Sequence, residues 1–391
     1  MDFAFTQEEE RFREQLRAFL AQRLPQGWGD RDFTGEVSPE ERAALAQAVS
    51  KGLADQRWLA LAWPEQYGGG GAGQVQQMIM NEEAAYARMP GGGGAGVAWV
   101  GPALMMYGSE EQKKLFLPRI AGGDDTWTTL YSEPGAGSDL AALQTRAIRD
   151  GDEYVINGTK IWASGAREAS MGLLAARTDP HAAKHRGLSM FALPMDSAGI
   201  SVQPIEDMSG GQTLNEVHFE NVRIPSKNLI GQENRGWYQV AATLDFERSG
   251  VAAFSRGKRD IERLVEAAKD ERSLMSRNPN ARYELADRWI EMQVGFNVAY
   301  RIPFLQQQGV QPNHEASVSK LYGSELTQRV AQTGMQLLGA AGQLMPGSPY
   351  ARLGGAYSRL YLNAVASTIT AGTSEVQRNI IAQRGLGLPR G

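Results

Sequence analysis

Two changes in hydrophobic periodicity divide this chain into three regions. From Thr6 to about Gly122 apolar residues recur every three or four positions, which predicts helices. From Trp127 the pattern changes to short strand-like runs bounded by turn signals such as Asn157-Gly158. After Gly236 the helical period returns in long segments. The chain is therefore expected to be an α+β protein of several domains.

The first region is expected to be all-α, and its helices are Glu8–Arg23, Pro39–Gln56, Gln74–Met89 and Glu110–Ile120. The middle region is expected to form a small barrel or sandwich of seven strands: Trp127–Ser132, Gln144–Arg149, Glu153–Trp162, Met171–Arg177, Leu188–Pro194, Ile200–Pro204 and Asn215–Val222. The last region favours a four-helix bundle made of Gly236–Ala268, Pro279–Gln308, Asn313–Leu338 and Tyr350–Thr368, followed by a short helix at Ser374–Arg384. The expected domains are residues 1–123, 124–232 and 233–391.

Composition excludes several kinds of chemistry. The 391 residues include no cysteine and only four scattered histidines, which argues against a thiolate nucleophile and against a metal site. The net charge of −4 gives no general attraction to nucleic acid or to an anionic membrane. The N-terminus lacks a basic start followed by an apolar run, and no segment approaches the length of a membrane span. A cytoplasmic protein is expected.

The first helix of the last region places an acid on an apolar stripe. Residues three or four apart form this stripe: Val240, Leu244, Glu247, Val251 and Phe254. A buried carboxylate without a partner is costly, so such a group pairs with a cation, raises its pKa or faces a cavity where it has a chemical role. The pattern leaves a second interpretation open, in which the helix kinks near Gly250 and Glu247 is solvated.

A loop of small and hydroxylic residues follows the first predicted strand. It reads YSEPGAGSDL from Tyr131 to Leu140, and its free backbone N–H groups suit close approach to a flat or anionic ligand. It is neither a Walker loop nor a dinucleotide-binding G-x-G-x-x-G within a βαβ unit. A nicotinamide-binding domain is therefore disfavoured, and a plain glycine-rich turn is the second possibility.

Four motifs in one order resemble the flavin-dependent acyl-CoA dehydrogenase family. They are YSEPGAGSDL at 131–140, NGTKIWASG at 157–165, VHFENVRIP at 217–225 and GTSEVQR at 372–378. The resemblance covers essentially the whole chain. It implies an N-terminal helical domain, a middle β-barrel and a C-terminal four-helix bundle, in a chain that is usually part of a tetramer.

The resemblance also implies FAD contacts at matching positions. Tyr131 and Ser132 would bond the pyrimidine edge of the flavin, Trp162 would pack against the isoalloxazine, and Ser164 would place its hydroxyl near N5. The other implied contacts are Gly137 and Ser138 in the same loop, with Ser138 also near the thioester arm, Gln336 and Gly339 toward a neighbouring subunit's FAD, and Thr373 and Glu375 toward the ribose or pyrophosphate. Ser374 and Gln377 read as a capping box that opens the last helix.

Two departures from the family pattern bear on function. Many members carry their catalytic base directly before the Gly-Thr of the last motif, where this chain has Ala371. A subset, which includes enzymes like isovaleryl-CoA dehydrogenase and others acting on long, branched or steroid-derived acyl groups, places the base on the first bundle helix. LDFER at 244–248 matches that site, so the resemblance implies that Glu247 is the base and Arg248 a substrate contact. Ala371 keeps a backbone N–H that can bind the thioester oxygen.

The second departure is in the loop after Arg272. The family usually has a Phe-Gly there that contacts the adenine half of FAD across a subunit interface, and this chain has none. Assembly with an unlike partner subunit is therefore possible in place of a homotetramer. The chain could also be a subunit that is not competent alone, a monooxygenase-like enzyme or a DNA-associated homologue, the last disfavoured because acids intersperse the basic residues of the bundle. The resemblance also implies an acyl-CoA substrate and an electron-transferring flavoprotein that reoxidises the flavin.

Overall fold

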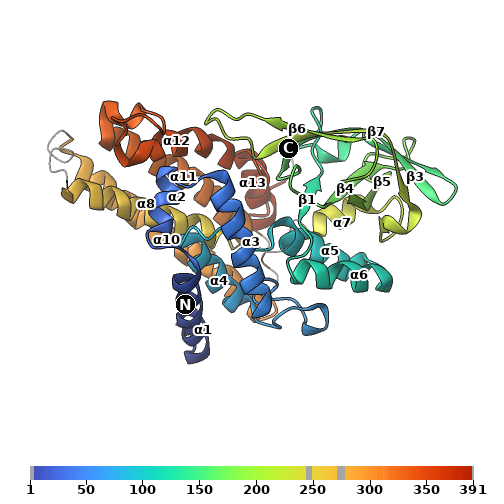
Figure 1. Ribbon diagram of the computed structural model, residues 1–391, viewed down its shortest axis with the longest axis horizontal. Coiled ribbons are helices and arrows are strands. Elements are labelled where there is room, and N and C mark those ends of the chain that lie inside the picture. The colour runs from blue at the N-terminus through green and yellow to red at the C-terminus, as the bar shows by residue number, and fades with distance from the viewer. Residues whose placement is uncertain (1–3, 244–248, 271–277, 311, 313, 390–391) are drawn as a thin grey trace. The chain divides into compact units, whose positions relative to one another are not determined.

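The structure is a computed structural model, shown in Figure 1. It describes every residue except 1–3, 244–248, 271–277, 311, 313, 390 and 391. Its residues fall into two compact units. The helical unit comprises 1–46, 72–90 and 248–391, and the sheet unit comprises 47–71 and 91–247. The expected succession of helical, sheet and helical regions is confirmed.

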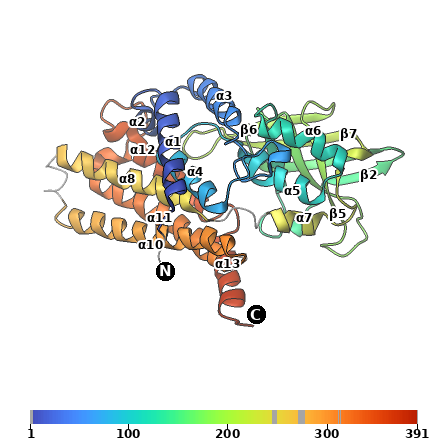
Figure 2. The same ribbon diagram turned by 90° about the horizontal axis from the view of Figure 1, so that it is seen from below.

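The helical unit is built around the predicted bundle. Its helices are α1 (Gln7–Arg23), α2 (Trp28–Thr34), the first residues of α3 (Pro39–Asp55), α4 (Gln74–Tyr86), α8 (Val251–Asp270), α10 (Ala281–Gln307), α11 (Glu315–Leu338), α12 (Ala356–Ser367) and α13 (Ser374–Ile380). Figures 1 and 2 both show α8, α10 and α11 running side by side, and α12 packs against α11. The four-helix bundle expected from the 3.6-residue period is confirmed.

Close approach of three bundle helices depends on small residues around one aromatic ring. Phe254 of α8 is 1% exposed, and its ring faces Gly295 of α10 and Gly323 of α11. A Cβ atom at Gly295 would lie 2.3 Å from that ring, and one at Gly323 would lie 3.2 Å from it. The two glycines therefore make room for the ring between the helices.

Gly295→Ala is expected to reduce the free energy of unfolding by about 1–3 kcal/mol, because the added methyl must displace a rigid buried ring. Urea unfolding of the purified variant measures this loss. Gly257→Ala on α8 is the matched control, since its Cβ would meet only the flexible end of Met292. Equal losses in the two variants would contradict the packing account.

The sheet unit contains one eight-stranded sheet and helices that pack against it. The strands are β1 (Trp127–Leu130), β2 (Arg146–Asp150), β3 (Glu153–Ser164), β4 (Met171–Arg177), β5 (Leu188–Pro194), β6 (Ile200–Ile205), β7 (Leu214–Pro225) and β8 (Leu229–Ile230). Pairing runs β6-β7-β3-β2-β4-β5-β8, and β1 pairs with β4 in parallel. All seven predicted strands are present, and β8 was not predicted.

Strand β4 shows why the middle of the sheet is buried on both faces. Alternate residues of a strand point to opposite faces. Leu173 and Ala175 join a core shared with α5 (Gly101–Tyr107) and α6 (Glu110–Ala121), whereas Leu174 and Ala176 join a core made mainly by strands. The strand therefore has no polar residue before Arg177 at its end.

The predicted continuous helix from Gly236 to Ala268 is wrong. Helix α7 ends at Thr243 and α8 begins at Val251, and Ser249 and Gly250 between them are not helical. Gly250 has φ +71°, a left-handed conformation that glycine adopts without a steric penalty. Val240 lies in the core of the sheet unit, and Phe254 lies in the helical unit. The predicted apolar stripe is therefore not one helix face.

In the part of the chain that the structure describes, no helix has both the length and the apolar character needed to cross a bilayer.

Candidate functional site

The loop after β1 is held by a buried glutamate. Glu133 and Ala136 exchange backbone hydrogen bonds of 3.0 Å, which close a turn over Pro134 and Gly135. The Glu133 carboxylate is 8% exposed and accepts hydrogen bonds from the backbone N–H groups of Gln144, at 2.6 Å, and Thr145, at 2.8 Å. This single side chain thus joins the loop to the residues that lead into β2.

The partner of Glu133 is a fully buried lysine. Lys160 Nζ on β3 donates to Glu133 Oε1 and to the carbonyl oxygen of Tyr131, both at 2.9 Å. Burial lowers the pKa of Lys160 to about 8, even though the adjacent carboxylate favours its charged form. Lys160 in turn helps to hold the pKa of Glu133 below its usual value, against the effect of burial. The pair fixes the position of Tyr131 relative to β3.

Neither Glu133 nor Lys160 was identified from the sequence as part of the site. Both lie inside motifs that were identified, and Lys160 occupies an inward-facing position of β3. A charged residue at such a position is the one sequence signal that could have revealed the pair, because buried charges require partners.

The rest of the loop is open on its outer side. Gly137 and Ser138 are exposed, and a Cβ atom built at Gly137 meets no atom within 4 Å. The protein itself therefore does not require glycine at this position for packing. An open, small-residue loop beside a rigid strand leaves room for a bound ligand.

Trp162 is turned out of β3 by a bulge. The pairing of β3 with β7 shifts in register between Lys160 and Ala163, and Trp162 within the shift has φ +62° and is 55% exposed. A non-glycine residue in this conformation costs about 1–3 kcal/mol and is concentrated at functional sites. The next outward residue, Ser164, is also exposed, while its carbonyl oxygen accepts a hydrogen bond of 3.0 Å from the Thr128 hydroxyl.

The loop and the bulge are neighbours in the structure. The backbone N–H of Ile161 donates to the carbonyl oxygen of Ser132 at 2.9 Å, which joins the loop to β3 at the residue before Trp162. Tyr131, Ser132 and Trp162, predicted from separate motifs, are therefore brought together within the sheet unit.

Trp162→Gly is expected to change the stability of the apoprotein by less than about 1 kcal/mol, because glycine relieves the left-handed strain and the exposed ring has few contacts to lose. The same change is expected to weaken FAD binding by about tenfold or more through loss of an aromatic wall. Thermal unfolding of the apoprotein and a fluorescence titration with FAD measure the two effects. Unchanged FAD affinity would show that the ring is not a cofactor contact.

The last predicted motif forms a strained turn before α13. Ala371 has φ +52° and Gly372 has φ +89°. The Gln377 side chain donates to the carbonyl oxygens of both residues, at 3.3 and 3.4 Å, and so stabilises the turn. The predicted capping box of Ser374 and Gln377 is wrong, because Thr373 is the cap and its hydroxyl accepts from the Val376 N–H at 3.2 Å. The helix itself begins at Ser374, as its predicted range has it.

A cavity of about 480 Å³ lies beside this turn within the helical unit. Its lining includes Thr373, Ser374 and Glu375, together with Gln328 and Gln332 of α11. Ser374 is 5% exposed, and among the described residues its hydroxyl oxygen has no hydrogen-bond partner. A buried polar atom without a partner carries a desolvation cost that a ligand would remove.

Gln336, a predicted contact, is exposed one helical turn beyond Gln332 on the same face of α11. Gly339 ends that helix with φ +61° and ψ −138°, a conformation that requires glycine for reasons of backbone geometry alone. The predicted residues Glu247, Arg248 and Arg272 lie outside the described residues.

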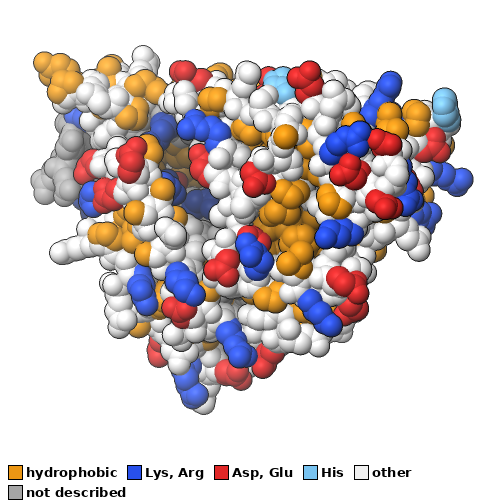
Figure 3. All heavy atoms as spheres, turned by 45° about the vertical axis from the view of Figure 1, so that its right-hand side comes forward, with side chains coloured by type: hydrophobic (Ala, Val, Ile, Leu, Met, Phe, Trp, Pro, Cys, Tyr) orange, Lys and Arg blue, Asp and Glu red, His pale blue; other side chains and the backbone are white. Residues whose placement is uncertain are grey.

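Basic and acidic side chains are interspersed on the face shown in Figure 3. That face has no continuous basic stripe of the kind that binding to a nucleic-acid backbone requires.

Comparison with known proteins defines the class of this chain. Family models described as the N-terminal, middle and C-terminal domains of acyl-CoA dehydrogenase match residues 6–124, 128–222 and 234–386. These enzymes are oxidoreductases, and the family is flavin-dependent in general. The chain belongs to the acyl-CoA dehydrogenase family.

Relatives match over the full length. Acyl-CoA dehydrogenase FadE26 of Mycobacterium tuberculosis is 33% identical, over 100% of this chain and 99% of the relative. The solved structure of the Tcur3481-Tcur3483 steroid ACAD is 35% identical, covers 100% of both chains and has a TM-score of 0.89. The ChsE4-ChsE5 complex from Mycobacterium tuberculosis is 34% identical, covers 100% of both chains and has a TM-score of 0.86.

Proposed function

We propose that this chain catalyses the FAD-dependent α,β-dehydrogenation of an acyl-CoA thioester that carries a long, branched or ring-bearing acyl group. The observation that carries the proposal is the strained, exposed Trp162 beside the YSEPGAGSDL loop, in a member of the acyl-CoA dehydrogenase family. The backbone strain that holds this aromatic ring outward indicates a functional role, and a flat ligand such as a flavin ring would pack against the ring.

The residues present fit FAD in three respects. The loop at Gly137 is open, Trp162 offers an aromatic face, and the Ser374 hydroxyl, which lines a cavity, has no partner in the part of the chain that the structure describes. We assign Tyr131, Ser132, Gly137, Ser138, Trp162 and Ser164 to the flavin half of the cofactor. We assign Thr373 and Glu375 to the FAD ribose or pyrophosphate, and Gln336 and Gly339 to the FAD of a neighbouring subunit. When bound, FAD supplies the acceptor for the substrate's β-hydride at flavin N5.

The chain's own residues perform the proton transfer and hold the substrate. The Glu247 carboxylate removes the α-proton, and its basicity increases where water is excluded from around it. The backbone N–H of Ala371 donates to the thioester oxygen as negative charge develops there. Arg248 and Ser138 are assigned to binding of the substrate.

The proposed substrate class follows from position 371. A methyl side chain at Ala371 occupies less space than the glutamate that many family members have, which favours a bulky acyl group. The Tcur3481-Tcur3483 relative is itself a steroid ACAD, which supports a ring-bearing substrate.

The proposed assembly is a tetramer, either of this chain alone or with a related subunit. Two relatives of similar length are two-component assemblies, Tcur3481-Tcur3483 and ChsE4-ChsE5. An electron-transferring flavoprotein is the proposed acceptor of the electrons.

Anaerobic titration of the purified, FAD-loaded protein with acyl-CoA esters tests this function. Straight-chain, branched and steroid-like esters are compared, and loss of the visible flavin absorption reports dehydrogenation. Bleaching by the branched or ring-bearing esters is the expected result. A flavin that no ester bleaches would contradict the proposal, and rapid oxygen consumption by chemically reduced flavin after air is admitted, without formation of an enoyl-CoA product, would favour monooxygenase chemistry instead.

A further inference from the structure

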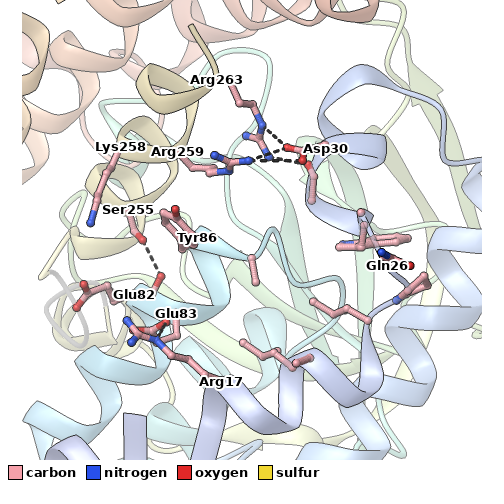
Figure 4. A pocket seen from close by; sticks show the side chains of 18 residues that line it. Arg17, Gln26, Asp30, Glu82, Glu83, Tyr86, Ser255, Lys258, Arg259 and Arg263 are labelled. Carbon is pink, nitrogen blue, oxygen red and sulfur yellow. Dashed lines mark hydrogen bonds and ion pairs between the residues drawn. The ribbon is translucent and has the colours of Figure 1, made fainter. Parts of the chain in front are cut away.

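A second cavity in the helical unit is lined by none of the residues assigned to the proposed dehydrogenation. Its volume is about 610 Å³, and residues of α1, α2, α4 and α8 line it (Figure 4). Sites for small organic ligands have volumes of roughly 300–1,000 Å³. The cavity is therefore of the right size for a single amphipathic molecule.

The acidic side chains in the lining are already neutralised. Asp30 accepts from Arg263 Nε at 2.8 Å and from Arg259 at 3.2 Å, and Figure 4 shows both guanidinium groups directed at it. Glu83 accepts two hydrogen bonds of 2.8 Å from Arg17. A cationic ligand would have to displace these fixed partners, so the lining disfavours positive charge.

Glu82, the third acid of the lining, is also engaged. The Tyr300 hydroxyl donates to it at 3.0 Å, and Arg13 lies 3.3 Å from it. Its backbone carbonyl oxygen accepts from the Ser255 hydroxyl at 2.7 Å. None of the three acids is therefore available to a ligand cation without the loss of an existing bond.

Lys258 is the exception among the charged residues of this cavity. Among the described residues it has no hydrogen bond and no ion pair, and its ammonium group lies 5.8 Å from the centre of the Tyr86 ring. The Tyr86 hydroxyl donates to Glu262 of α8 at 2.6 Å, which fixes the ring and engages the acid four residues after Lys258. One wall of the cavity thus presents an unpaired cation next to a fixed aromatic ring.

Part of the lining is apolar. Leu20 and Trp28 are 5% and 2% exposed, and Leu24 lies between them in sequence. Trp28 Nε1 donates to the carbonyl oxygen of Arg88 at 3.0 Å, so the indole has no donor left for a ligand. This part of the cavity can contact a hydrocarbon chain or ring system.

We propose that this cavity binds a carboxylic acid with an apolar body, its carboxylate on Lys258 Nζ and its body across Tyr86 toward Leu20. The unpaired ammonium group of Lys258 selects an anionic ligand, and the three acids do not compete for Lys258 because each already has a partner. The apolar residues of the lining contact the hydrocarbon body of the ligand. None of the residues assigned to FAD, to the substrate or to the proton transfer lines this cavity, so decanoate binding there can be tested separately from turnover.

Calorimetric titration of the full-length protein with decanoate tests the proposal. The wild type is expected to bind decanoate, and decylamine, which has the same chain and the opposite charge, is expected not to bind. Lys258→Gln is expected to weaken decanoate binding by about tenfold or more, which corresponds to the loss of one charge-assisted hydrogen bond. Lys258→Arg should retain most of the affinity, because the positive charge is kept.

Lys269→Gln is the matched control, since Lys269 is an exposed lysine in the last turn of the same helix and does not line the cavity. Its affinity for decanoate is expected to equal that of the wild type. Absence of decanoate binding by the wild type would overturn the proposal. Equal affinity in Lys258→Gln and the wild type would also overturn it, by placing the decanoate elsewhere on the protein.

Discussion

Replacement of Glu247 by glutamine is expected to lower kcat by about a hundred- to ten-thousand-fold, the usual range for loss of a general base. An amide cannot accept the α-proton, so the substrate should no longer bleach the flavin. FAD content should be unchanged, because none of the residues assigned to FAD is altered. Stopped-flow absorbance after mixing with acyl-CoA measures the bleaching rate directly.

Asp245→Asn provides the matched control for Glu247→Gln. Asp245 is a second acid in the same LDFER segment, and its replacement tests whether any local change of charge slows the reaction. Near-normal bleaching by the Asp245 variant, together with none by the Glu247 variant, is the expected pattern. Normal turnover by Glu247→Gln would show that another group removes the proton.

Glu133→Ala is expected to reduce the free energy of unfolding by about 3–5 kcal/mol. The change leaves Lys160, which is 0% exposed, without its counter-ion, and breaking a buried ion pair in this way has a cost of that size. It also removes the acceptor for the backbone N–H groups of Gln144 and Thr145. Urea unfolding followed by tryptophan fluorescence measures the loss.

Lys160→Met is the comparison variant for Glu133→Ala. It removes the buried cation and keeps a side chain of similar length, while Glu133 retains its two backbone donors. Its loss of stability is therefore expected to be clearly smaller than that of Glu133→Ala. A larger loss of unfolding free energy in Lys160→Met than in Glu133→Ala would contradict this account, in which an unpaired buried Lys160 destabilises the fold more than an unpaired Glu133 does.

The stability of the wild type should rise relative to Lys160→Met as pH increases from about 8 to about 10. The pKa of Lys160 is lowered to about 8 in the folded protein, whereas an unfolded lysine has a pKa of about 10.4. Between these values the unfolded chain binds more protons than the folded one, so the free energy of unfolding increases with pH. Urea unfolding midpoints of both proteins, measured from about pH 8 to about pH 10, test the sign of this pH dependence. Parallel profiles of the wild type and Lys160→Met would contradict it.

Hydrophobic period was sufficient to predict most of the elements. The strand-like runs and the long helical segments gave all seven strands and the bundle, because each pattern matches the face that the element buries. The interpretation of Gly236–Ala268 as one helix failed, whereas the break near Gly250 allowed by the second interpretation is present as a left-handed turn. The prediction also failed at Thr373, because Thr and Ser are both competent caps and the sequence does not decide between them.

The site was predicted in part. The motifs identified Ser132 and Trp162, which the structure brings together, because the backbone of the loop bonds to β3. The bulge that exposes Trp162 was not predictable, since it depends on a register shift against β7, a strand far away in sequence. The Glu133–Lys160 pair was missed for a similar reason, because the partner of a buried charge is set by the fold.

The visible absorption spectrum of the chain, purified alone and then mixed anaerobically with a branched or steroid-like acyl-CoA, tests the central claim most directly. A flavin spectrum that is bleached on mixing is the predicted result, and it would establish both FAD binding and α,β-dehydrogenation. A colourless folded protein that gains flavin and activity only with a related subunit would assign the function to a heteromeric enzyme. A flavin that no acyl-CoA ester bleaches would contradict the proposed function.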